Sequence, residues 1–159
     1  MAAKLLKFGV PILFLALVVF VIAAPIGPVP GFFIGGTAAD APDAWGDTQS
    51  IHEIKLEINT GILPRVVTIW VVQHDGALYV VGDGTSGWVT MLDQGGPVRM
   101  RMGDKTYSLK ASRVRRNLVP ILEAYQGKYQ ADYPEIISSF PPVEEAIKSA
   151  GIFRLGLAP

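Results

Sequence analysis

The chain has 159 residues, a mass of 17.1 kDa and a formal net charge of zero, with 14 basic and 14 acidic residues. Lys4 and Lys7 precede a hydrophobic run, and the rest of the chain is therefore slightly acidic. This balance argues against a nucleic-acid partner, because such a partner normally requires a basic face. The chain has no cysteine, which excludes disulfides, thiolate metal sites and cysteine nucleophiles.

The N-terminal segment predicts a membrane anchor. Residues 8–24 carry no charge, and a helix of that length measures about 25 Å, at the short end of what crosses a bilayer. We therefore expect residues 1–26 to anchor the protein in a lipid bilayer. Lys4 and Lys7 lie on the short N-terminal side of this run, and basic residues beside a membrane span are enriched on its cytoplasmic side. The N-terminus should therefore be cytoplasmic and the domain extracytoplasmic, or periplasmic in a bacterium. A cleaved signal peptide is the alternative, although Ile22 and Pro25 make a poor cleavage signal.

Residues 27–50 are rich in Gly, Pro and Ala, so neither a helix nor a strand can extend far. We expect a linker here, followed by one domain over residues 51–159. Phe32, Phe33 and Trp45 are unusual in a spacer. Each would lie at the membrane surface or pack on the domain.

The first half of the domain has strand patterns. Residues 54–58 alternate apolar and charged side chains, as in a half-buried strand. Residues 66–73 form a β-branched and aromatic run that indicates a buried strand. Asp75-Gly76 then predicts a hairpin turn into residues 78–81. Residues 88–92 could form a short helix or a strand.

A second hairpin is expected from residues 98–102 and 106–111. Helical spacing begins at Val114 and should stop at Gly127, and a further helix is expected over residues 142–150. Residues 152–155 alternate again and predict a last strand. The sequence therefore predicts a mainly β domain, a small antiparallel barrel with flanking short helices.

Four local features occur in a fixed order. A strand ends in T-G-x-x-x-R, an apolar strand and D-G turn lead into L-Y-V-V, a Gly-rich loop precedes Trp and Leu, and a last strand reads F-R-L. Over residues 54–157 this order resembles the FMN-binding split β-barrels and, among them, the deazaflavin-dependent nitroreductase-like branch. The residues that carry it are Thr60, Gly61, Arg65, Gly84, Gly87, Trp88, Leu92 and Phe153 to Leu155.

The resemblance implies FMN or a deazaflavin bound in a groove, often at a homodimer interface, with amides and basic side chains holding the phosphate. The cofactor-binding candidates are Thr60, Gly61, Arg65, Ser86, Gly87 and Trp88. Deazaflavin-binding members typically read T-x-G-R-K-S-G-x-x-R. Here Ile62, Leu63 and Pro64 replace the basic and small residues.

Two functions follow from the sequence. One is a membrane-tethered, nitroreductase-like oxidoreductase, in which the cofactor supplies the redox chemistry. The other is a tethered, non-catalytic module that binds another small molecule or a partner protein. His52 and His74 lack metal-site or triad spacing, so the sequence supports no metal site and identifies no catalytic residue.

Overall fold

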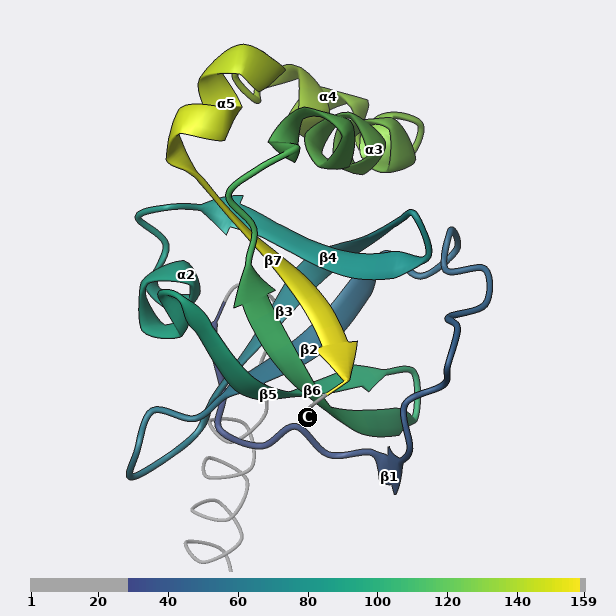
Figure 1. Cartoon of the computed structure of the whole chain (residues 1–159), viewed down its shortest axis with the longest axis vertical. Helices are drawn as coiled ribbons and strands as arrows, with labels where there is room; N and C mark the ends of the chain where they lie inside the picture. Colours follow the sequence, from purple (N-terminus) through teal and green to yellow (C-terminus); the bar gives the residue numbers. More distant parts are fainter. Residues whose placement is uncertain (1–28, 158–159) are drawn as a thin grey trace, which may run out of the picture.

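The computed structural model describes residues 29–157 and shows a mainly β protein with a few short helices (Figure 1). Six antiparallel strands form a barrel, and a seventh short strand joins it in parallel. The strands are β1 (Thr37–Ala39), β2 (Glu53–Ile58), β3 (Arg65–His74), β4 (Ala77–Asp83), β5 (Gly95–Met102), β6 (Lys105–Arg113) and β7 (Ala150–Leu157).

Strand β6 closes the barrel. The strand order β6-β5-β2-β3-β4-β7 returns to β6, because β7 pairs with β4 on one edge and with β6 on the other. Residues 109–113 of β6 pair with β7, whereas residues 105–107 pair with β1. Strands β1 and β7 thus share one edge of β6, with β5 on the opposite edge.

The alternation in β2 is reproduced in the fold. Ile54, Leu56 and Ile58 are at most 3% exposed and face the barrel interior, while the charged residues between them face outward. Leu56 lies opposite Met100 of β5, which is fully buried. Other strands add the remaining interior residues: Val71, Leu78, Val80, Val98, Leu109, Ala111, Phe153 and Leu155.

Three helices form a second layer beside the barrel (Figure 1). They cover the outer face of β3 and β4, where Val72, Trp70 and Tyr79 point away from the barrel interior. These helices are α3 (Leu118–Gln130), α4 (Pro134–Ser138) and α5 (Val143–Ser149). A further short helix, α2 (Gly87–Leu92), lies between β4 and β5.

Two buried side chains connect the helical layer to the barrel. The ammonium of Lys128 donates hydrogen bonds to the backbone carbonyls of Thr48, Ile51 and Val71 at 2.7–2.9 Å. The neighbouring Tyr129 is fully buried, and its hydroxyl lies within hydrogen-bond distance of the Val71 carbonyl, at 2.7 Å. Lys128 therefore supplies a donor to the Ile51 carbonyl and connects α3 to β3 and to the segment before β2.

The helical prediction needs two corrections. Helix α3 begins at Leu118, not Val114, because Asn117 adopts a left-handed backbone with φ 52°. It also continues through Gly127 to Gln130, since the buried Tyr129 anchors its last turn. The short helix α4 was not predicted. Residues 88–92, for which the sequence left two alternatives, lie in helix α2.

The stretch predicted to be a linker packs along the barrel from Gly31 onward, and we call residues 31–49 the arm. Gly31 exchanges two backbone hydrogen bonds with Val66, at 2.8 and 2.9 Å. Ile34 is 2% exposed, and Trp45 packs edge-on against Tyr107 with ring centroids 5.2 Å apart. Of the two positions predicted for Trp45, the structure shows packing on the domain.

The predicted anchor, residues 1–26, lies outside the described residues. Within residues 29–157, every helix is too short or too polar to cross a bilayer.

Candidate ligand-binding site

The predicted cofactor residues fall into two groups. The first group comprises Thr60 and Gly61 in the turn between β2 and β3, together with Arg65 at the start of β3. The second group comprises Ser86, Gly87 and Trp88 at the start of α2. No hydrogen bond or ion pair joins the two groups within residues 29–157. Whether either group holds a cofactor stays a prediction.

The β2–β3 turn uses its polar groups internally. The Thr60 hydroxyl donates to the Leu63 carbonyl, and the Gly61 N–H donates to the Asn59 side chain at 3.0 Å. Gly61 has φ +102°, which favours glycine. These donors close the turn, so they do not point toward a phosphate. Arg65 remains exposed at the first position of β3.

The polar groups of the loop before α2 also find their hydrogen-bond partners within the loop. The Asp83 carboxylate accepts hydrogen bonds from the hydroxyl and the backbone N–H of Thr85, and these bonds hold its pKa below the usual value. The Ser86 hydroxyl donates to the Asp83 carbonyl at 2.7 Å. A phosphate here would meet an ionised carboxylate.

Trp88 packs as part of the barrel core. Its ring is tilted on Phe153 with centroids 5.7 Å apart. It also lies directly over Gly82, where an added Cβ would be 2.4 Å from the indole. The indole is thus held by packing. For Trp88, one of the predicted cofactor-binding residues, this geometry favours a structural role.

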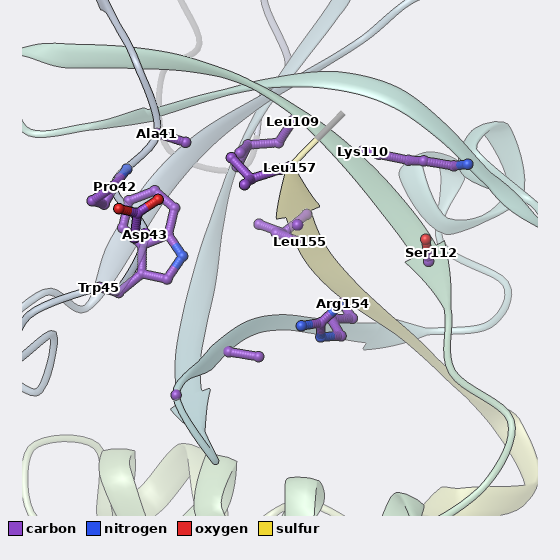
Figure 2. Close-up of a pocket in the computed structure, with 13 residues that line it drawn as sticks. Ala41, Pro42, Asp43, Trp45, Leu109, Lys110, Ser112, Arg154, Leu155 and Leu157 are labelled. Carbon is purple, nitrogen blue, oxygen red and sulfur yellow. The ribbon is translucent and has the colours of Figure 1, made fainter. Parts of the chain in front are cut away.

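A groove of about 390 Å³ lies between the arm and the barrel (Figure 2). Its walls are the arm near Trp45, the β3–β4 turn and the adjoining strands β6 and β7. Leu157 is exposed in the groove, whereas Leu109 and Leu155 beneath it are almost completely buried. The remaining lining residues are Ala41, Pro42, Asp43, Gly76, Ala77, Lys110, Ser112, Arg154 and Gly156.

Arg154 provides the charge at the groove. Figure 2 shows its guanidinium pointing from β7 toward the side where Asp43 and Trp45 lie, whereas Lys110 extends the other way. Within the described part of the chain, Arg154 has no ion-pair partner at 4 Å or less. Ser112 lies opposite it in the β6–β7 register. The groove thus has a mainly polar lining that includes a free guanidinium, a hydroxyl and an indole.

The sequence could have revealed Arg154 but not the groove. Arg154 alternates with the buried Phe153 and Leu155, so its outward direction was readable. The position of Trp45 could not be inferred from the sequence, because it depends on how the arm packs against the barrel. The two predicted groups remain away from this groove, since none of their residues lines it.

The two arginines of β5 form ion pairs or hydrogen bonds with other residues of the barrel and the arm. Arg99 pairs with Glu57 at 3.0 Å, and Arg101 donates to the carbonyls of Gly103 and Ile34 at 2.9 and 3.2 Å. The observed contacts tie neighbouring strands and the arm together.

The fold is similar to solved split-barrel structures. A protein described as a candidate 5-nitroimidazole antibiotic resistance protein from Bacteroides thetaiotaomicron has a TM-score of 0.52, with 13% identity over 73% of this chain and 82% of its own. The heme storage protein HutZ from Vibrio cholerae has a TM-score of 0.50, with 17% identity over 70% and 84%. At these identities the similarity concerns the fold alone.

No protein-family model matches the sequence, and no curated protein matches it.

Proposed function

We propose that the protein is a membrane-tethered split-barrel module that binds a small anionic molecule in the groove beside Trp45. The observation that carries this proposal is the guanidinium of Arg154, which lies unpaired among the described residues at the edge of the groove. The tether is the predicted N-terminal anchor.

The chemistry of the groove suits such a ligand. A guanidinium binds a carboxylate or phosphate through two parallel hydrogen bonds. The Trp45 ring and the exposed Leu157 offer apolar contact to part of the ligand. The volume lies within the usual range for small-molecule pockets, roughly 300–1,000 Å³.

A flavin- or deazaflavin-dependent oxidoreductase, as a homodimer, is the second candidate. Its support is the fold, which resembles that of the candidate nitroimidazole resistance protein. The residues predicted to bind the cofactor phosphate do not fit this role well, because the donor groups of Thr60, Gly61 and Ser86 already form hydrogen bonds within their own turns. We therefore derive no reaction step through a flavin.

A titration of two matched arginine variants separates the candidates. The full chain in detergent is titrated with FMN and with a deazaflavin, and mass spectrometry identifies any copurified ligand. For a ligand in the groove, Arg154→Ala should weaken binding about tenfold or more, because a hydrogen bond to a charged group contributes about 1.5–3 kcal/mol. Arg65→Ala should leave that binding unchanged.

The opposite result favours the second candidate. Loss of flavin binding in Arg65→Ala, together with loss of nitro- or quinone-reducing activity and no effect of Arg154→Ala, would place the ligand at the β2–β3 turn. The tether is tested separately by whether the protein stays with membranes after an alkaline carbonate wash. Protease digestion of intact spheroplasts then tests the predicted orientation of the domain.

A further inference from the structure

We propose that the β2–β3 turn is a lipid-contacting surface that holds the barrel against the bilayer. We call the two apolar side chains of this turn, Ile62 and Leu63, the apolar tip. The inference rests on the proposed membrane tether and goes beyond it, because a tether alone leaves the orientation of the barrel open.

The apolar tip consists of strongly exposed side chains. Ile62 is 99% exposed and Leu63 is 59% exposed. Large apolar side chains gathered at one exposed place mark an interaction site more often than isolated ones do. Val29, at the first described position, is also 62% exposed.

Backbone pairing brings the two segments together. Gly31 and Val66 exchange two hydrogen bonds in an antiparallel bridge. Val66 follows Arg65 at the start of β3, so this bridge places the start of the arm beside the β2–β3 turn. After Gly31 the arm bends and runs to the β5–β6 hairpin, where the Ile34 carbonyl accepts a hydrogen bond from Arg101.

The sequence before the described residues indicates what covers this surface. The uncharged run of residues 8–24 ends five positions before Val29. The most apolar segment of the chain therefore joins the barrel at the end that carries the apolar tip. A lipid bilayer that receives this segment would also lie within reach of the tip.

The turn is suited to the membrane interface because its polar groups are paired. The Thr60 hydroxyl and the Gly61 N–H already have partners within the turn. Entering a less polar medium therefore leaves these two donors satisfied. Arg65 is exposed beside the turn and has no acidic partner within the described residues, so its guanidinium can meet lipid phosphates.

The composition of the turn also favours lipid. Ile62, Leu63 and Pro64 occupy its centre. A turn whose polar groups are paired internally and which exposes Ile62 almost completely is better suited to lipid than to a phosphate.

The absence of cysteine permits a direct test. Ile62→Cys is labelled with the environment-sensitive fluorophore NBD in the full chain, reconstituted into vesicles of phosphatidylcholine and phosphatidylglycerol. The matched control is Ile136→Cys on helix α4, where the side chain is 44% exposed. We expect the label at position 62 to emit at shorter wavelength and to be quenched by nitroxide-labelled lipid. The label at position 136 should instead be quenched by aqueous iodide.

Two results would overturn the inference in different ways. If the protein stays with the vesicles after a carbonate wash but both labels are equally accessible to iodide, the tether stands and the apolar tip does not contact lipid. If the protein leaves the vesicles, the tether fails and the inference fails with it. A third variant, which combines Ile62→Ser with a label on Leu63→Cys, should move the label into water if the two side chains of the tip enter the lipid together.

Discussion

Replacing Lys128 by methionine should destabilise the protein substantially. The ammonium belongs to a residue that is 6% exposed, and it donates to three carbonyls. Two of these have other donors, since Thr48 accepts from the Ile51 N–H and Val71 from the Tyr129 hydroxyl. The Ile51 carbonyl would lose its only side-chain donor within the described residues.

The magnitude follows from opposing contributions. Each hydrogen bond to a charged group contributes about 1.5–3 kcal/mol, and an orphaned carbonyl costs about 1–3 kcal/mol. Methionine avoids burying a charge, which recovers several kcal/mol. We therefore expect Lys128→Met to lower the free energy of unfolding by about 3 kcal/mol and the melting temperature by roughly 10 °C.

The pH dependence gives the same experiment a second readout. Burial lowers the pKa of Lys128 from 10.5, and the charge of Asp47 opposes this shift. Between the lowered pKa and 10.5 the unfolded chain binds more protons, so the stability contributed by this group rises with pH in that window. Lys128→Met should abolish this rise.

The assay is urea unfolding followed by tryptophan fluorescence, in detergent, at pH 7 and at steps up to pH 10. Lys148→Met, on the exposed surface of α5, is the control and should stay within about 0.5 kcal/mol of the parent. Equal stability of the two variants would refute the view that Lys128 joins α3 to the barrel. So would an unchanged pH profile in Lys128→Met.

Three further changes test separate parts of the fold. Burial raises the pKa of Tyr125 above its usual 10.0, so stability should fall as pH rises above 10, and Tyr125→Phe should reduce that fall in pH-dependent melting. Gly82→Ala places a Cβ 2.4 Å from the Trp88 ring and should cost about 1–3 kcal/mol in thermal unfolding. Trp45→Ala removes the edge-on contact with Tyr107 and should make the arm more sensitive to limited proteolysis, whereas an unchanged digest would contradict its packing role.

The strands of the barrel were predictable because their alternation is local. In β2 the apolar residues recur every second position, and Asp75-Gly76 adopts positive φ at both residues, as expected for a tight hairpin. The first residue of α3 was not predictable, because the spacing of apolar residues does not show that Asn117 adopts a left-handed backbone conformation. Helix α4 has only five residues, too few for a periodic signal.

The candidate site was less predictable than the fold. Thr60 and Ser86 were identified as donors from their residue types, but residue type does not show that nearby carbonyls accept their hydrogens. The groove depends on contacts between Trp45 and strands more than 60 positions away. A single sequence carries no direct signal for such a contact.

The position of β7 has a consequence for how the chain folds. This strand follows all the others in the described sequence, yet it pairs with both β4 and β6 and so completes the barrel. Until synthesis has passed Leu157, the edges of β4 and β6 remain open, and the barrel must form through contacts distant in sequence. Slow closure and exposed strand edges during synthesis follow from this order. Deleting residues 150–157 should therefore cause aggregation and not merely a loss of stability.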